Sequence, residues 1–203
     1  MNDTRFPRRL ILASASPRRH DILNTAGIPH EIRAADADET LPAHITPANA
    51  VEMLSARKAA AAHTGKEDEI ILAADTVVSL GDRILGKPRD AAEAASMLHA
   101  LSGTTHAVYT GYTITDGRIT VTSHEKTVVR MRVILPEEID AYIATGEPMD
   151  KAGAYGYQSL AGIFVSGIEG DYFNVVGLPL CAVSTALRDR FGFTPAWQAG
   201  ALN

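Results

Sequence analysis

The amino-acid sequence predicts an α/β fold in which an elongated sheet is surrounded by helices. The strongest observation is the segment EIILAADTVVSL, residues 69–80, a nearly continuous apolar run interrupted by Asp75 and Thr76. Such continuity is typical of a strand that helices cover on both faces. The second observation is the alternation of β-rich runs with segments that carry helix-capping signals.

The chain begins with a strand, a short helix and an acidic loop. LILA, residues 10–13, has the apolar character of a buried strand. Ser16 is a good N-cap, and Pro17 suits the first helical position, where its missing N–H group costs nothing. The helix that they start is expected to end near Thr25. Residues 30–38 then run extended into a loop that ends with the sequence DET.

Two more helices and a hairpin are expected in the middle of the chain. The Ala-rich residues 47–64 predict a long helix that ends before a glycine. In the next helix Asp90 is the N-cap, and Glu93, three residues further on, completes a capping box. Two β-rich runs, residues 105–115 and 118–133, meet at an Asp-Gly dipeptide, which is a strong signal for a β-hairpin.

The C-terminal part is predicted to be less regular. A helix is expected within residues 135–147, where a proline lies near its first position. The glycine-rich residues 152–178 are interpreted as loops and short strands, and residues 178–192 as a final helix. Residues from about 194 to 203 resemble a loose tail. Because no repeat, low-complexity block or clear linker interrupts it, the whole chain, residues 1–203, is expected to form one domain.

Composition and charge exclude several classes of protein. Hydrophobic residues make up 46% and charged residues 21% of the 203 residues, which is ordinary for a globular protein. The net charge of −5 gives no basic excess for a nucleic-acid partner. The single cysteine, Cys181, excludes an intrachain disulfide and is expected to lie in the core. Neither a signal peptide nor an apolar segment of about 20 residues is found, so no membrane partner is expected and the protein is predicted to be cytoplasmic.

Arg18 and Arg19 follow the N-cap of the first helix directly. A cation is disfavoured there by roughly 0.3–1 kcal/mol, because the helix dipole is positive at this end. Either the two arginines are ordinary surface charges, or a strongly anionic group binds between them and the free N–H groups of the helix.

Asp75 and Thr76 are the polar residues that the strand pattern does not explain. A carboxylate at the end of an apolar strand must be compensated by a cation, a metal or a hydrogen-bond donor. Asp75 is therefore either a metal ligand or general base in a crevice at the end of the strand, or a turn or capping residue. Thr76 either hydrogen-bonds a substrate or is an ordinary β-branched strand residue.

Three loops contain further candidates. Lys87, between Gly86 and Pro88, suits a phosphate as a point charge but is also an ordinary loop lysine. The sequence DADET, residues 36–40, offers carboxylates to a divalent cation or is a solvated acidic loop. Gln158 carries both a donor and an acceptor for a base edge, or belongs to an irregular surface loop. Taken together, the cations and the metal candidate suit a polyphosphate.

The seven histidines form no HExxH or His-x-His pattern, so no zinc site is expected. The sequence also lacks a GxSxG elbow, a Walker lysine motif and a GxGxxG motif.

Seven motifs, in order along residues 10 to 180, resemble the Maf family of nucleoside triphosphate pyrophosphatases. They are LILASASPRR, DADET, LAADTVV, ILGKP, LSGTTHAVYTG, GEPMDKAGAYGYQ and IEGDYFNVVGLPL. The resemblance implies a two-lobed α/β fold similar to inosine triphosphate pyrophosphatases, with the nucleotide in a cleft between the lobes. It also implies metal-dependent hydrolysis of a nucleotide to its monophosphate and pyrophosphate.

The resemblance implies roles for individual residues. Asp75 matches the catalytic carboxylate, and Lys58 and Lys87 are expected to act with it from the phosphate side. Glu39 is expected to hold a divalent cation, Mg²⁺ or Mn²⁺, together with Asp75. The residues expected to bind the substrate are Ser16, Arg18, Arg19, Thr76 and Gln158.

The sequence AYGYQ resembles the branch of the family that hydrolyses dTTP and UTP. Gln158 suits this substrate, because a glutamine pairs with the N3–H group and a carbonyl of uracil or thymine. The branch that acts on 7-methyl-GTP carries a glutamate near this point. Two departures stand out: Ser159 occupies a position where the family usually has glycine, and EMLSARKA lacks an upstream arginine.

Alternatives to this prediction stay open. The substrate is either dTTP and UTP, including modified pyrimidine nucleotides, or 7-methyl-GTP or another noncanonical nucleotide. In a different class of function, the chain is a nucleotide-sensing regulator of cell division and septum formation. The expected partner is a nucleoside triphosphate, and a homodimer is left open.

Overall fold

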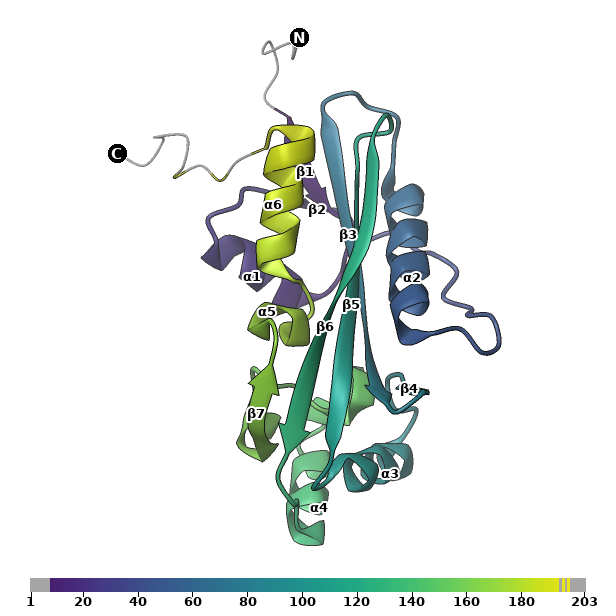
Figure 1. Cartoon of the computed structure of the whole chain (residues 1–203), viewed down its shortest axis with the longest axis vertical. Coiled ribbons are helices and arrows are strands. Elements are labelled where there is room, and N and C mark those ends of the chain that lie inside the picture. The colour runs from purple at the N-terminus through teal and green to yellow at the C-terminus, as the bar shows by residue number, and fades with distance from the viewer. Residues whose placement is uncertain (1–7, 194, 196, 198–203) are drawn as a thin grey trace.

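The computed structural model describes residues 8–193, 195 and 197. Within this part of the chain, seven strands form one mixed sheet in the order β2-β1-β3-β5-β6-β7, and β4 pairs with β3 beside this path (Figure 1). The strands are β1 (Arg9–Leu12), β2 (Glu31–Ile32), β3 (Glu69–Leu80), β4 (Arg83–Leu85), β5 (Thr105–Thr115), β6 (Thr120–Met131) and β7 (Val165–Glu169).

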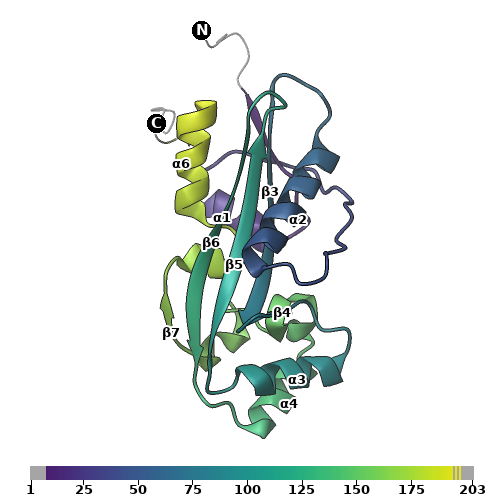
Figure 2. The same ribbon diagram turned by 45° about the vertical axis from the view of Figure 1, so that its right-hand side comes forward.

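Helices lie on both faces and at one end of this sheet (Figures 1 and 2). The α-helices are α1 (Pro17–Thr25), α2 (Pro47–Ala62), α3 (Ala91–Leu101), α4 (Pro136–Ala144), α5 (Tyr172–Val176) and α6 (Leu180–Phe191). The 3-10 helices in the described part of the chain are η1 (Glu147–Asp150), η2 (Ala152–Ala154) and η3 (Leu160–Phe164). The predicted α/β class and the elongated sheet with surrounding helices are confirmed.

Two lobes share the long strands β3, β5 and β6. In the upper lobe of Figure 1, α2 packs on one face of the sheet, and α1 and α6 pack on the other. In the lower lobe, α3, α4 and the 3-10 helices bury a separate apolar cluster against the ends of the same strands. The two lobes therefore have separate cores, and the strands that run through both hold them together.

Strand β3 has a gap on one of its edges. β1 pairs in parallel with residues 69–72, and β4 pairs antiparallel with residues 78–80. On the opposite edge, β5 pairs with β3 continuously from Ile71 to Ser79. Residues 73–77 of β3 are thus paired with a strand on one side only, among the residues that the structure describes, and this free edge contains Asp75 and Thr76. The predicted place of Asp75 at the end of the strand is wrong, because β3 continues past it to Leu80.

Gly111 lets α2 approach the sheet closely beside this free edge. It lies opposite Asp75 on β5, and a Cβ atom added there would lie 2.4 Å from the carbonyl carbon and oxygen of Val51 in α2. Such a distance is far inside van der Waals contact, so any larger residue would displace the helix. The glycine thereby fixes the distance between α2 and Asp75.

Several local predictions need correction. Ser16 occupies the N-cap of α1, but its side chain makes no capping hydrogen bond. The Glu93 carboxylate accepts from the backbone N–H of Arg89 instead of from that of the N-cap Asp90. Residues 152–178 contain η2, η3 and α5 in addition to loops and β7, because glycine-rich turns also form short helices.

Cys181 is exposed at the start of α6, so its predicted place in the core is wrong. The buried residues of α6 are Val183, Leu187 and Phe191. Cys181 precedes Val183 by two positions and is therefore about 200° away from it around the helix. The expected tail, from about residue 194 to 203, lies mostly outside the described residues. No helix in the described part of the chain is long and apolar enough to cross a membrane.

Candidate active site

A cavity of about 370 Å³ lies along the free edge of β3, between the two lobes. Its walls come from the start of α1, the acidic loop, α2, β3, the loop after β4, and the segments around η2 and α5. The structure places all nine sequence-predicted site residues in its lining: Ser16, Arg18, Arg19, Glu39, Lys58, Asp75, Thr76, Lys87 and Gln158.

Arg19 is held in the cavity wall by neutral acceptors. Its Nε donates to the carbonyl oxygen of Gly177 at 2.8 Å. Its two terminal nitrogens donate to Ser14 Oγ at 3.0 Å and to Thr76 Oγ1 at 3.2 Å. Burial lowers the pKa of the guanidinium below its usual value, while the charge of Asp75 opposes this effect.

No carboxylate pairs with Arg19 among the described residues, so its positive charge is not neutralised by direct contact. A guanidinium has five N–H groups, and three of those of Arg19 have partners. Arg19 also lies at the positive end of α1, where backbone N–H groups lack helical partners. Both features make this wall of the cavity attractive to an anion.

Lys58 contacts two carboxylates, that of Asp75 on the free edge of β3 and that of Glu39 in the acidic loop. Its ammonium group donates to Asp75 Oδ1 and lies 2.8 Å from Glu39 Oε1. Hydrogen bonding from Lys58 lowers the pKa of Glu39 below its ordinary value, so this carboxylate is charged at neutral pH. The side chains of Lys58 and Asp75 are only 16% and 14% exposed, which limits the screening of their contact by water.

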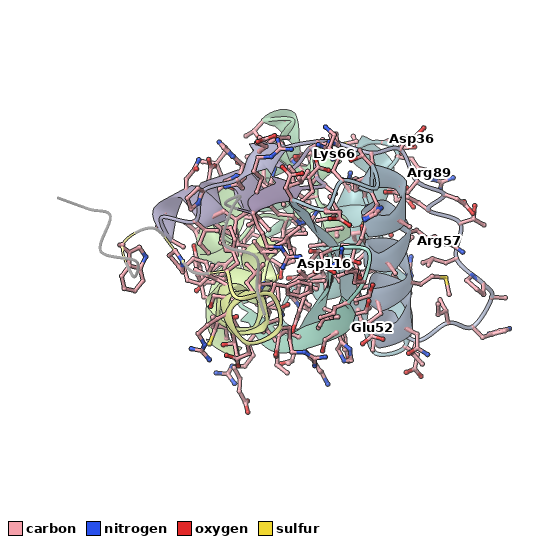
Figure 3. The ribbon with its side chains drawn as sticks, turned by 90° about the horizontal axis from the view of Figure 1, so that it is seen from above. Asp36, Glu52, Arg57, Lys66, Arg89 and Asp116 are labelled. Carbon is pink, nitrogen blue, oxygen red and sulfur yellow. The ribbon has the colours of Figure 1, made fainter. Side chains whose placement is uncertain are left out.

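The acidic loop owes its position to Arg57, the neighbour of Lys58 on α2. The Arg57 guanidinium donates to the backbone carbonyls of Asp38 at 3.0 Å and of Thr40 at 2.7 Å. Figure 3 shows Arg57 on the side of α2 that faces this loop. Glu39 lies between the two anchored carbonyls, so Arg57 sets where its carboxylate meets Lys58. Both of these helix cations thus hold the acidic loop, Arg57 through backbone carbonyls and Lys58 through Glu39.

Arg18 reaches across the cavity to the lower lobe. Its Nη1 lies 3.1 Å from Asp150 Oδ2, at the end of η1. The other oxygen of Asp150 lies 2.7 Å from Lys151 Nζ, which also donates to the carbonyl of Glu147. This contact joins α1 of one lobe to η1 of the other at the mouth of the cavity.

Gln158 and Lys87 are exposed residues of the cavity lining in the lower lobe. The loop of Gln158 begins at Tyr155, whose hydroxyl lies 2.7 Å from Nε2 of the buried His106. Burial lowers the pKa of His106 to about 4, so its imidazole is neutral at pH 7. A neutral imidazole and a phenol form an uncharged hydrogen bond that anchors the start of this loop in the lower core.

Two carboxylates are the residues that fit a divalent cation. Glu39 and Asp75 both contact the single ammonium of Lys58, so their oxygens already converge on one positive charge. Mg²⁺ is commonly held by one or two carboxylates, with substrate phosphates and water completing its shell. No group of three or more His, Cys, Asp or Glu side chains suited to a metal occurs among the described residues. The donor set therefore fits a cation that arrives with a phosphate ligand.

Several contributors to the site were not predicted from the sequence. Ser14 and the Gly177 carbonyl hold Arg19, and Asp150 holds Arg18. The sequence signal for Asp150 is its place beside Lys151 in the motif GEPMDKAGAYGYQ. The Gly177 carbonyl has no side-chain signal at all.

The fold is mixed α/β, and the cavity at the free edge of its central strand is cationic. These two features define a protein that can bind a multiply charged anion. The family model described as "Maf-like protein" matches residues 9–190. Because this match covers most of the chain, the protein belongs to the Maf family, and the family resemblance seen in its motifs is confirmed.

Relatives extend the comparison over nearly the whole chain. A "dTTP/UTP pyrophosphatase" of Bacillus cytotoxicus is 48% identical over 181 residues, which is 89% of this chain and 95% of the relative. A protein of the same name from Pelotomaculum thermopropionicum is 48% identical over 188 residues, 92% of this chain and 98% of the relative. Among solved structures, the Staphylococcus aureus Ham1 protein matches with a TM-score of 0.44 and 14% identity, covering 61% of this chain and 72% of the other.

Proposed function

We propose that this protein hydrolyses nucleoside triphosphates, dTTP and UTP above all, to the nucleoside monophosphate and pyrophosphate. The observation that carries the proposal is the meeting of three charged groups, Asp75, Lys58 and Glu39, opposite the unneutralised Arg19 in one cavity. The relatives named dTTP/UTP pyrophosphatase support the choice of substrate, since each is aligned with this chain over most of its length.

The triphosphate is proposed to lie between the start of α1 and the loop after β4. Arg19 and the free N–H groups of α1 would bind phosphate oxygens from one side, and Lys87 from the other. Ser16, at the N-cap, has a side chain that is not used for capping and is therefore available to a phosphate oxygen. Arg18 would exchange Asp150 for a phosphate oxygen of the substrate, since both partners are anions.

A divalent cation, Mg²⁺ or Mn²⁺, is proposed to be held by Glu39 and Asp75, and it would supply charge stabilisation for the pyrophosphate leaving group. Lys58 holds both carboxylates and so keeps them in place before substrate arrives. Asp75 has one oxygen on Lys58, and its second oxygen, Oδ2, is the proposed acceptor of the proton from the attacking water.

The reaction proposed is attack of that water on the α-phosphorus. The new bond joins the water oxygen to phosphorus, and the bond from phosphorus to the bridging oxygen of the β-phosphate breaks. Pyrophosphate leaves with the electron pair of that bond, and the proton of the water goes to Asp75. No covalent intermediate with the protein is required, because the two products form in one displacement.

Base selection is assigned to Gln158 of the lower lobe and to Thr76 of β3. Gln158 is proposed to pair with the N3–H group and a carbonyl of uracil or thymine. The Thr76 hydroxyl lies within hydrogen-bond distance of Arg19 and of Thr110 Oγ1, which itself donates to the carbonyl of Asn174. Thr76 therefore accepts from Arg19 and donates to Thr110, and its effect on selection would act through the position of Arg19.

The test is a panel of nucleotides with the purified protein. The panel contains dTTP, UTP, CTP, GTP, ITP and 7-methyl-GTP, each with Mg²⁺, Mn²⁺ or EDTA, and pyrophosphate is measured separately from orthophosphate. Metal-dependent release of pyrophosphate from dTTP and UTP is expected. Selective cleavage of another nucleotide would refute the role given to Gln158, and binding without hydrolysis would point to a nucleotide-sensing regulator.

A cytoplasmic location is proposed in addition, because the single cysteine fits a reducing compartment.

A further inference from the structure

The carboxylate of Glu147 holds the segment that directly follows Gln158. Its Oε1 accepts hydrogen bonds from Ser159 Oγ at 2.7 Å and from the hydroxyl of Tyr142 at 2.9 Å. Its Oε2 accepts from the backbone N–H of Leu160 at 3.4 Å. One side chain from the start of η1 thus fastens two successive residues of the loop.

Glu147 is itself fixed and charged. Its backbone carbonyl accepts from Lys151 Nζ at 2.8 Å, and the side chain of Lys151 is only 11% exposed. Burial raises the pKa of the Glu147 carboxyl, but the hydrogen bonds from Ser159 and Tyr142 outweigh burial and leave the pKa below its ordinary value. The anchor is therefore an ionised acceptor, and hydrogen bonds to an ionised group are the stronger kind.

The Ser159 side chain also packs against Gly156, which precedes Gln158 by two positions in the loop. Its Oγ also lies 3.2 Å from the carbonyl oxygen of Gly156. A Cβ atom added to Gly156 would come within 2.6 Å of this Oγ and of Lys151 Cε, so the loop is closed tightly around the hydroxyl. Gln158 lies between Gly156, against which Ser159 Oγ packs, and Ser159, whose hydroxyl proton is donated to Glu147.

We propose that Ser159 and Glu147 are positioning residues that set the base selectivity of the site by fixing Gln158 at the cavity. This proposal rests on the proposed function, in which Gln158 reads the base. Glu147 does not line the cavity, so it acts only through the loop. The hydroxyl at position 159 is the feature that allows the contact, since a glycine at this position would have no donor for the carboxylate.

The experiment compares Ser159→Ala, which removes the hydroxyl, with Ser159→Thr, which keeps one. Ser166→Ala is the matched control, because Ser166 also donates to a backbone carbonyl and lies outside the cavity. For each variant, kcat and KM are measured with dTTP and CTP, together with the inhibition constant of inorganic pyrophosphate, which has no base.

Ser159→Ala is expected to lower the ratio of kcat/KM for dTTP to kcat/KM for CTP by about 3- to 10-fold, the factor that one hydrogen bond is typically worth. The change should lie in KM for dTTP, while kcat for dTTP and the pyrophosphate inhibition constant stay within about twofold. Ser159→Thr should restore the ratio, and Ser166→Ala should leave it unchanged.

A second variant tests the pair itself. Glu147→Ala should lower the same ratio, and the double variant should be no less selective than the more affected single variant, because each single change already breaks the Ser159–Glu147 hydrogen bond. Additive effects of the two changes would overturn the proposal. So would an equal loss for dTTP, CTP and pyrophosphate, which would indicate a general structural role.

The selectivity of the wild type, Gln158→Ala and Ser159→Ala for dTTP over CTP distinguishes failure of this inference from failure of the proposed function. If the wild type prefers dTTP and Gln158→Ala abolishes the preference while Ser159→Ala leaves it intact, only the positioning role is wrong. If the wild type hydrolyses dTTP and CTP equally well or hydrolyses neither, the proposed function and this inference are both wrong.

Discussion

Glu69 is the buried carboxylate on which the parallel part of the sheet depends. It is 1% exposed at the start of β3 and accepts two hydrogen bonds from Arg33, at 2.7 and 2.8 Å. Arg9 on β1 lies 3.1 Å from the same carboxylate, and Thr64 Oγ1 donates to it at 2.8 Å. The ion pairs hold the starts of β1 and β3 and the residue after β2 together, and so set the position of the strand that carries Asp75.

The contribution of this carboxylate to stability follows from its pKa. Hydrogen bonds from Arg33, the main cause, lower the pKa of Glu69 from 4.5 to about 2. Since a factor of ten in a proton affinity corresponds to about 1.4 kcal/mol, the ionised carboxylate contributes about 3 kcal/mol at pH 7. Because the pKa is lower in the folded state, this contribution is complete above about pH 4.5, falls to about half near pH 3, and is lost around pH 2.

Glu69→Gln is therefore expected to lower the free energy of unfolding by up to about 3 kcal/mol at pH 7. Urea unfolding of the wild type and the variant at pH 7, 5 and 3 measures this, and the difference should shrink by about half between pH 7 and pH 3. Glu67→Gln is the matched control, since Glu67 is 84% exposed and pairs with Arg118 in solvent; little change is expected. A loss below about 0.5 kcal/mol for Glu69→Gln, or one independent of pH, would refute the reasoning.

Three further predictions concern the cavity. Gly111→Ala should lower the free energy of unfolding by about 1–3 kcal/mol, because its Cβ would lie 2.4 Å from the backbone of Val51; urea unfolding checks this, and an unchanged midpoint would contradict it. Arg18→Ala should raise KM for dTTP by about tenfold or more, the value of a charge-assisted contact with phosphate; steady-state kinetics with an unchanged KM would remove Arg18 from the site. EDTA should abolish pyrophosphate release and added Mg²⁺ or Mn²⁺ should restore it, whereas full activity in EDTA would exclude the proposed role of Glu39.

Local signals in the sequence were enough for most elements of the fold. Ser16 and Pro17 mark the start of α1, and a helix from Pro17 to Thr25 is confirmed. The Asp-Gly dipeptide between β5 and β6 correctly marks their hairpin, although the connection includes Arg118 and Ile119, whose N–H groups donate to Asp116 Oδ1. Caps and turns act over a few residues, which is why a single sequence shows them.

Contacts between distant segments could not be read from such signals. Arg19 stands out in the sequence as a cation at the wrong end of a helix, but its partner Gly177 is 158 residues away and uses only its backbone. Arg57 looks like an ordinary helix cation until the fold brings the carbonyls of Asp38 and Thr40 beside it. The sequence predicts which residues are chemically unusual, whereas the acceptors that hold them depend on how the lobes pack.

The central claim is that the cavity around Asp75 cleaves nucleoside triphosphates, and the most direct test compares the wild type with Asp75→Asn. Pyrophosphate release from dTTP and UTP is measured for both proteins with Mg²⁺ and Mn²⁺, and equilibrium dialysis measures nucleotide binding. The wild type is expected to release pyrophosphate, and the variant to lose at least about 100-fold in turnover while it still binds, as expected for loss of a general base. Turnover by Asp75→Asn above about a tenth of the wild-type rate, or no release by the wild type with either metal, would contradict the claim.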